Sequence, residues 1–277
     1  MNWFAKRYTH IIIIGNGFDL NLGLKTSYTD FISSEHFNNQ VNNGNDLCHY
    51  LQEQHNLKRW IDIENELKAY SNMNAENFEE DFDNLCSALM EHLKDLNYDE
   101  INWDSHAYNL IKQIRSQEFL ILDFNYTKSI YKLLVDLSYP TSLIKERIVK
   151  VHGSIESGNI IFGVEDQARI HRQDIFLKKT CNINYAPIPF RQLLENASEV
   201  HIFGHSLGET DHMYFFDFFS GCTNRRASND MGSIFLYYFG KTGYKELHMQ
   251  LDDLTIKRIG FLKQNTKFNQ IDVSKPK

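Results

Sequence analysis

The chain has 277 residues, a formal net charge of -7 and 13% aromatic residues, enough to build one large core or two small ones. Only 4 Pro and 14 Gly argue against a disordered or low-complexity chain. Because the charge is negative and no cluster of Lys and Arg stands out, nothing predicts binding to nucleic acid or to an anionic membrane.

Six short segments rich in β-branched and aromatic residues are predicted to be strands. In chain order they are His10–Ile14, Phe119–Phe124, Arg147–Val151, Asn159–Phe162, Val200–Phe203 and Ser233–Phe239. Most are apolar on both faces, as expected of a parallel sheet that is covered on both sides. Helical stretches between several of them predict a doubly wound, mainly parallel α/β sheet.

The region from about 35 to 117 contains no predicted strand. Its charged segments have helical spacing, and in one of them apolar residues recur at steps of three and four. These residues are Phe78, Phe82, Leu85, Leu89 and Leu93. We predict a helical insertion that lies over the sheet, within a single domain spanning residues 1–277.

Small and polar residues follow several of the predicted strands. Open α/β sheets bind ligands beyond the carboxyl ends of their strands, so these segments together form one candidate site. They are Gly15-Asn16-Gly17-Phe18-Asp19, Asn125-Tyr126-Thr127, His152-Gly153-Ser154, Gly163 and Gly204-His205-Ser206. Any one of them could be an ordinary loop or helix cap, but their recurrence at one end of several strands favours a site.

The turn after the first strand has features of a phosphate-binding turn, in which glycines let backbone N–H groups approach a phosphate. Gly15 and Gly17 are present, but Leu20 stands where G-x-G-x-x-G requires a third glycine. No second strand carries a ribose-binding acid about 20 residues further on, which argues against an ordinary dehydrogenase. A nucleotide-phosphate turn of another kind stays open. Asp19 could bind a ribose hydroxyl or only cap the first helix.

The segment Gly204-His205-Ser206-Leu207-Gly208 fits G-x-S-x-G, the nucleophile elbow of α/β-hydrolases. Such an enzyme needs an acid and then a histidine after the serine, and Asp230 and His248 are the available pair. The carboxylate of Asp211, close in sequence, would oppose an oxyanion at Ser206. The alternative is that Ser206 caps a helix with Asp211 in its first turn.

The sequence gives no pattern typical of a metal site. Cys48, Cys86, Cys181 and Cys222 are scattered without a C-x-x-C pair, which also argues against a disulfide framework. His201 and His205 are four residues apart, but on a strand-to-turn segment rather than on a helix. We therefore expect no metal.

The N-terminus and the apolar runs bear on the compartment. MNWFAKRYTHIIIIGNGFD lacks the apolar length and the small-residue cleavage site of a signal peptide. No run approaches the ~20 apolar residues of a membrane span. Together with the unpaired cysteines, this predicts a cytoplasmic protein without membrane contact.

Five strings, taken in order, resemble one protein family. IIIIGNGFDLNLGLKTSY, WIDIENEL, FNYTKSIYKLL, VHGSI and VHIFGHSLGETDHMYFFDF, from about His10 to Phe218, are similar to motifs of the AbiH phage abortive-infection proteins. The resemblance implies a role in antiphage defence. It also makes GHSLG part of the family's fifth motif, which shapes a nucleotide-site loop, rather than an esterase elbow.

AbiH proteins are in turn similar to sirtuin-like NAD-cleaving proteins of bacterial defence, which implies a Rossmann-like (sirtuin-like) sheet. In those folds a Gly-rich first turn holds phosphates, while an asparagine and the histidine of a His-Gly pair act on the nicotinamide ribose. The matching positions are Gly15, Gly17 and Asp19, then Asn125, then His152 with Gly153, and finally Gly204 and Ser206. Asn16, Phe18, His205 and Asp211 lie in or near the same segments, and we include them among the predicted nucleotide contacts. The four-cysteine zinc module of sirtuins is absent from the sequence, so protein deacetylation is not expected.

The resemblance implies NAD as substrate and hydrolysis of its nicotinamide–ribose bond. Nicotinamide is a good neutral leaving group, so the site must stabilise an oxocarbenium-like centre and deliver a nucleophile. His152 could act as general base towards a ribose hydroxyl or a water, and Asn125 could hold either. The carboxylates of Asp62 and Glu64 could close over the site or lie on a solvated helix face.

Two other functions stay open. One is a non-catalytic nucleotide-binding sensor that acts through a partner protein, and the other is a serine hydrolase that uses Ser206. A cell-killing NADase needs restraint, so we expect a homo-oligomer or a regulatory partner protein.

Overall fold

The computed structural model describes residues 8–58, 62–224 and 232–276. Six strands there form one parallel sheet in the order β3-β2-β1-β6-β7-β8, and β4 and β5 form a separate antiparallel hairpin. The strands of the sheet are β1 His10–Ile14, β2 Phe119–Asp123, β3 Ile148–Lys150, β6 Glu199–Phe203, β7 Ser233–Tyr238 and β8 Lys267–Asp272. The winding of the chain reverses between β1 and β6.

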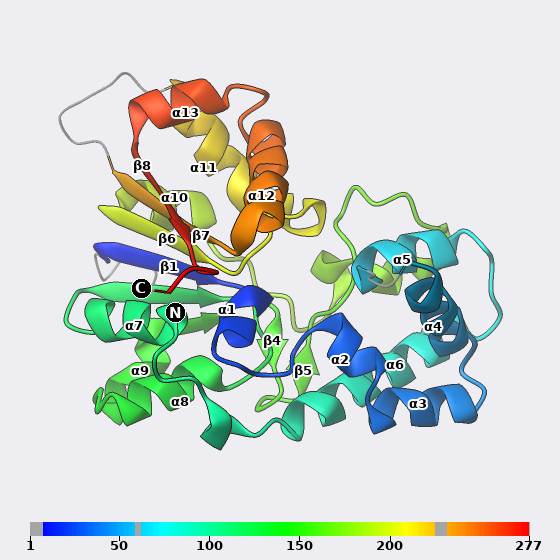
Figure 1. Cartoon of the computed structure of the whole chain (residues 1–277). Coiled ribbons are helices and arrows are strands. Elements are labelled where there is room, and N and C mark those ends of the chain that lie inside the picture. The colour runs from blue at the N-terminus through cyan, green and yellow to red at the C-terminus, as the bar shows by residue number, and fades with distance from the viewer. Residues whose placement is uncertain (1–7, 59–61, 225–231, 277) are drawn as a thin grey trace.

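Helices cover both faces of the sheet, because the central strands are apolar on both faces (Figure 1). On β1, Ile11 and Ile13 face one helical layer, and Ile12 and Ile14 face the other. Each of these four side chains is 0% exposed, which stabilises the fold by about 1.5–3 kcal/mol per residue. The sequence prediction of a mainly parallel α/β sheet flanked by helices is confirmed.

The two layers draw on different parts of the chain. One layer contains α10 Phe190–Asn196, α11 His212–Asn224, α12 Gly240–Leu254 and α13 Ile259–Asn265. The other contains α1 Asn16–Asn21, α7 His106–Ile114, α8 Ser129–Asp136 and α9 Thr141–Arg147, with the short 3₁₀ helix η1 Tyr98–Glu100 beside them. None of the helices in the described part of the chain is both long and apolar enough to cross a membrane.

Five of the six predicted strands lie in the sheet, with ends within one residue of the prediction. The exception is Asn159–Phe162. Its first residues form β5 Asn159–Ile160, which pairs with β4 Gly153–Ser154 outside the sheet. The sequence pattern does not predict β8, because this edge strand reads KFNQID and is only half-buried.

Five helices, one that precedes the predicted insertion and four within it, pack around a core of their own, and we call them the helical unit. They are α2 Tyr28–Ile32, α3 Glu35–Asn42, α4 Asp46–Lys58, α5 Ile63–Ser71 and α6 Phe78–Lys94. The apolar positions predicted on α6 are all buried in this core, together with Ile160, Phe162 and Leu177. Leu177 belongs to a long segment after β5 that carries the 3₁₀ helices η2 Arg172–Leu177 and η3 Lys179–Cys181.

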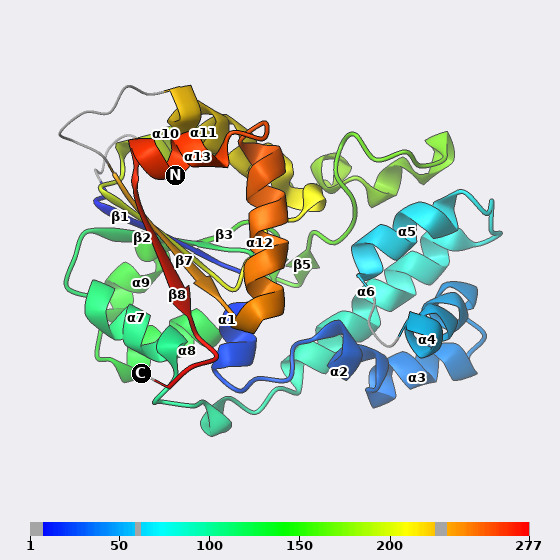
Figure 2. The same cartoon turned by 45° about the horizontal axis from the view of Figure 1, so that its top comes forward.

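The helical unit lies beside the sheet and beyond the carboxyl ends of its strands, rather than over a sheet face (Figures 1 and 2). Helix α7 falls within the predicted insertion but packs on the sheet through Leu110 and Ile111. The edge of the sheet where ligands are expected therefore faces the helical unit.

Candidate functional site

The turn after β1 and the turn after β6 pack directly against each other. The N–H of Gly17 donates to the carbonyl oxygen of Gly204 at 2.8 Å. A Cβ on Gly204 would lie 2.1 Å from the nitrogen of Phe18, and a Cβ on Gly15 would lie 2.7 Å from the Cα of His205. Glycine is required at these positions because two backbones occupy the space that a side chain would need.

The turn after β1 offers few free amides to a phosphate. The N–H groups of Gly15, Gly17 and Phe18 donate to backbone carbonyl oxygens at 3.1, 2.8 and 2.8 Å. The Phe18 ring is fully buried, whereas Asn16 is exposed. A phosphate bound here would depend on Asn16 more than on a cradle of glycine amides.

Asp19 links the turn after β1 to the start of α8. Its Oδ1 accepts a hydrogen bond from Ser129 Oγ at 2.5 Å, and its Oδ2 accepts one from Thr127 Oγ1 at 2.6 Å. Burial raises the pKa of Asp19 to about 6, although the two hydroxyl groups oppose this. Asp19 does not cap α1. To bind a ribose hydroxyl it would have to release one of these partners.

Lys150 and Asn125 fix the loop after β2. Lys150 Nζ donates to Asp123 Oδ2 at 2.5 Å, to the carbonyl oxygen of Asn125 at 3.0 Å and to that of Thr127. The Nδ2 of Asn125 donates to the carbonyl oxygen of Gly15 at 3.1 Å. The sequence does not reveal the role of Lys150, because a lysine at the end of a short strand is ordinary.

A buried polar cluster is centred on Asp211. The Oδ1 of Asp211 lies 2.9 Å from Lys179 Nζ and 3.4 Å from His152 Nε2, and its Oδ2 lies 3.3 Å from His205 Nε2. Lys179 Nζ also lies 3.1 Å from Glu64 Oε2. We call these five residues the Asp211 cluster. Lys179, His152 and His205 are only 2%, 4% and 6% exposed.

The sheet side of the Asp211 cluster depends on two unusual backbone conformations. Gly153 has a φ of +77°, which lets the chain enter the β4–β5 hairpin directly after His152. Leu207 has a φ of +55°, a conformation that costs a non-glycine residue about 1–2 kcal/mol. The N–H of Leu207 donates to His205 Nδ1 at 2.9 Å, so a neutral His205 carries its proton on Nε2, which faces Asp211.

Glu64 and Lys179 reach the cluster from the side of the helical unit. Asp62 caps α5 by accepting the N–H of Asn65, which places Glu64 in the first turn of the helix. Lys179 begins η3, and its N–H donates to the carbonyl oxygen of Val164, a residue of the helical unit's core. Glu64 thus closes over the sheet edge, while Asp62 serves as a helix cap.

The cluster drives apart the pKa values of its two carboxyl groups. Burial by itself would raise the pKa of Asp211, but Lys179, His152 and His205 outweigh it and hold that pKa well below its usual range. Burial raises the pKa of Glu64 to about 7; Lys179 opposes this increase and Asp211 adds to it. At neutral pH, Asp211 is therefore ionised and Glu64 is near its midpoint.

His152 is neutral at pH 7. Burial, and next the charge of Lys179, lower its pKa to about 3. Its ring packs edge-on against Phe124, with the ring centroids 5.1 Å apart, and Phe124 also packs against His205. The Nε2 of His152 forms no hydrogen bond with any described residue. This atom is buried beside Asp211, so a ligand could bond to it only after the site opens.

Comparison with known protein families assigns the chain to one of them. Residues 11–118 and 89–229 match the family described as Bacteriophage abortive infection AbiH, and the two ranges together cover more than half of the chain. The chain belongs to the AbiH family. This confirms the resemblance to AbiH proteins that the sequence motifs indicate, and it implies a role in abortive infection of phage-infected cells. Neither the curated proteins nor the solved structures gave a match.

In this AbiH protein, Ser206 lies outside the Asp211 cluster. It is exposed, and its Oγ accepts the N–H of Gly208 at 3.2 Å. Within the described residues no histidine bonds to it; His248 Nδ1 contacts the carbonyl oxygen of Tyr244, and Asp230 lies outside the described residues. Ser206 does not cap a helix either, because α11 begins at His212 and Asp211 precedes it in η4 Glu209–Asp211.

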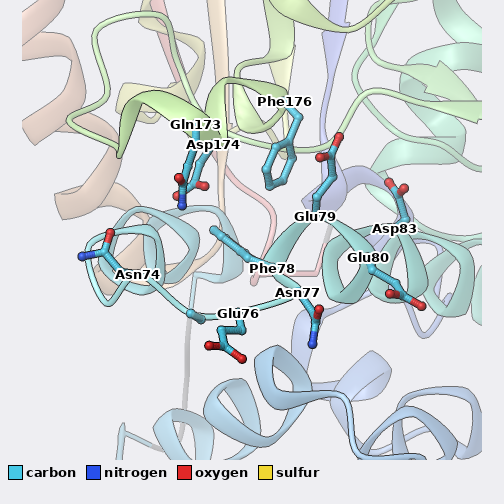
Figure 3. Close-up of a pocket in the computed structure, with 11 residues that line it drawn as sticks. Asn74, Glu76, Asn77, Phe78, Glu79, Glu80, Asp83, Gln173, Asp174 and Phe176 are labelled. Atoms are coloured by element: carbon cyan, nitrogen blue, oxygen red, sulfur yellow. The ribbon is translucent and has the colours of Figure 1, made fainter.

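A separate pocket of about 930 Å³ lies between the start of α6 and η2 in this AbiH protein (Figure 3). Around it stand the carboxylates of Glu76, Glu79, Glu80 and Asp83, and none of the predicted site residues lines it. Carboxylates repel phosphate groups, so this pocket is a poor match for a nucleotide. No group of His, Cys, Asp and Glu in the described part of the chain could hold a metal ion.

Proposed function

We propose that this AbiH protein hydrolyses NAD at the nicotinamide–ribose bond, with the Asp211 cluster as its catalytic centre. The observation that carries the proposal is that an ionised carboxylate, a carboxyl group of near-neutral pKa and an unpartnered imidazole nitrogen meet at one point. They belong to Asp211, Glu64 and His152.

The strand order of the sheet favours a nucleotide site beside the Asp211 cluster. Counted within the sheet alone, its strands run in the order 3-2-1-4-5-6, which is the order of Rossmann-like sheets. Those sheets bind their ligands where the winding reverses, and here that point lies between β1 and β6. The turns that carry Gly17 and Gly204 meet there, so the proposal includes a Rossmann-like, sirtuin-like nucleotide site.

The Asp211 cluster suits cleavage of an N-glycosidic bond. As the bond to nicotinamide breaks, its electron pair leaves with the ring and positive charge develops on the ribose, where the Asp211 carboxylate stabilises it. Water then bonds to the ribose carbon and gives its proton to Glu64, whose pKa of about 7 lies near the working pH. His152, a much weaker base, holds the ribose hydroxyl or the water through Nε2.

Asn125 takes a supporting role in this proposal. Its Nδ2 already donates to the carbonyl oxygen of Gly15, so its side chain joins the loop after β2 to the turn after β1, against which the nucleotide lies. This differs from the sequence-based hypothesis, in which His152 is the base and Asn125 directly holds the water or hydroxyl.

A nucleotide sensor without catalysis is the second candidate. The near-complete burial of His152 and Lys179 favours it, since a closed site can report nucleotide binding by opening towards a partner. Under either function, we propose that self-association or a regulatory protein restrains the molecule until infection.

The test is to measure NAD and nicotinamide with purified protein and in expressing cells before and after phage infection. Wild-type protein should release nicotinamide, and Asp211→Asn and Glu64→Gln should each lower the rate about 10²–10⁴-fold. Ser206→Ala tests the serine alternative. Its turnover rate at saturating NAD should equal that of the wild type, and its NAD binding should weaken only partly, because Ser206 is a predicted nucleotide contact outside the Asp211 cluster. Saturable NAD binding without turnover would support the sensor, and loss of turnover in Ser206→Ala alone would support a serine hydrolase.

A further inference from the structure

We propose that the ammonium group of Lys179 occupies the place of a cationic substrate group between Asp211 and Glu64, and that a ligand enters by exchanging its own positive charge for that of Lys179. The choice of ligand, a nucleotide with a pyridinium ring, rests on the proposed function. The exchange itself rests on the geometry of Lys179.

Lys179 lies between two carboxylates and away from water. Its Nζ is 2.9 Å from Asp211 Oδ1 and 3.1 Å from Glu64 Oε2, and the residue is 2% exposed. Removal of a lysine from water is costly unless carboxylates pair with it, and both carboxylates do so here. The position between them is therefore built for a positive charge.

The ion pair between Lys179 and Asp211 joins two parts of the molecule. Lys179 is anchored to Val164 and lies beside Glu64, on the side of the helical unit. Asp211 lies at the carboxyl edge of the sheet, together with His152 and His205. When Lys179 withdraws, the ion-pair partners left to buried Asp211 among the described residues are the imidazoles of His152 and His205. The carboxylate then takes up a proton or accepts another cation in the vacated place.

The surroundings of this position fit a flat aromatic cation. The rings of Phe124 and Tyr214 pack against His152, with centroids 5.1 and 5.8 Å away, so aromatic rings surround the imidazole that lies beside the carboxylate. Oxidised NAD carries a positive pyridinium ring, whereas the dihydropyridine ring of reduced NADH is neutral. Exchange with Lys179 therefore selects the oxidised form.

The test compares Lys179→Met, which removes the charge and keeps most of the side-chain length, with Lys179→Arg, which keeps the charge. Lys68→Met is the control, because Lys68 joins α5 to Glu165 in the same segment at 2.8 Å without reaching Asp211. Amide hydrogen exchange of residues 204–212 measures opening of the site. Equilibrium binding of NAD and of NADH measures selection by charge.

In Lys179→Met the amides of residues 204–212 should exchange about tenfold faster than in the wild type. The variant should also bind NAD about 10–100-fold more tightly, because the ligand no longer has to break a charge-assisted hydrogen bond. Its affinity for NADH should stay close to wild type. Lys68→Met should behave like the wild type, and Lys179→Arg, which keeps the positive charge, should gain no affinity for NAD. Lys179→Gln, measured alongside, keeps hydrogen bonding without charge and separates lost charge from lost packing.

Unchanged exchange and unchanged NAD affinity in both Lys179→Met and Lys179→Gln would overturn the proposal and leave Lys179 as a structural ion pair. If the affinities for NAD and NADH increased equally, the selection by charge would be overturned. It would also be overturned if no variant bound either nucleotide. Binding of NAD with the expected selectivity but without nicotinamide release would overturn hydrolysis and leave the exchange standing.

Discussion

Replacement of Gly204 by alanine tests how the candidate site is built. A Cβ at this position would lie 2.1 Å from the nitrogen of Phe18 and 2.3 Å from the carbonyl carbon of Gly17. Both are backbone atoms in the first turn of α1, so neither can rotate away. The residue also has a φ of +66°, which alanine adopts only under strain.

The expected loss of stability has two parts. The left-handed conformation costs alanine about 1–2 kcal/mol. Relief of the contact with the neighbouring turn adds about 1–3 kcal/mol, the usual cost of forcing an extra carbon into a packed region. Gly204→Ala should therefore lower the free energy of unfolding by about 2–5 kcal/mol. Gly158→Ala is the control, because Gly158 has a φ of +67° but no atom within 4 Å of its Cβ.

The assay is urea unfolding followed by circular dichroism, with both variants compared with the wild type at pH 7. Gly158→Ala should lose only about 1–2 kcal/mol, and the difference between the variants reports the contact between the two turns. If both variants lose the same amount, the turns do not depend on this contact and our account of GHSLG is refuted.

Three further predictions follow from the buried carboxyl groups and from Ser206. Asp211→Asn removes the charge that pairs with buried Lys179 and should destabilise the fold by about 3–5 kcal/mol in the same assay; a loss below about 1 kcal/mol would contradict this. The pKa of Asp19 is about 6 in the folded state against an ordinary value of 3.8, so protonation of Asp19 adds about 3 kcal/mol to the free energy of unfolding. This contribution is fully present below pH 3.8 and is lost as the pH rises through 6. Asp19→Asn should remove this pH dependence, and an unchanged pH profile would show that Asp19 is not its source. Ser206→Ala should change stability by less than about 0.5 kcal/mol, and a fluorophosphonate probe should not label the wild type; stoichiometric labelling that disappears in the variant would restore the serine hydrolase.

Much of the sheet can be predicted from the sequence because its signal is local. A run such as Ile11–Ile14 is short, β-branched and apolar at every position, which is typical of a strand covered on both faces. The same reasoning fails for Asn159–Phe162, which is also apolar but buries Ile160 and Phe162 in the core of the helical unit. Apolar residues indicate that a segment is buried, but they do not show in which of two cores it is buried.

The candidate site is predictable in part for a related reason. Parallel strands end at one edge of a sheet, so the sequence alone predicts that His152, His205 and Asn125 lie near one another. It does not predict the place of Lys179, which lies 32 residues from Asp211 and 115 from Glu64, in a segment without a regular hydrophobic pattern. The packing of the helical unit brings these charges together, and no local spacing encodes it.

The glycines of the two turns explain how a nucleotide would be recognised here. A phosphate-binding turn and a close contact between two backbones both require glycine, so the sequence cannot distinguish them. The direction of the N–H groups in the structure does distinguish them. Because the N–H of Gly17 donates to Gly204, the turn after β1 stabilises the fold and has little left to offer an anion. Under the proposed function, recognition then depends on side chains: exposed Asn16 at one end, and the buried charge of Asp211 at the other. A dinucleotide with anionic phosphates and a cationic ring fits this arrangement of Asn16 and Asp211 only when its ring faces Asp211. Hydrolysis at the nicotinamide–ribose bond requires the same orientation.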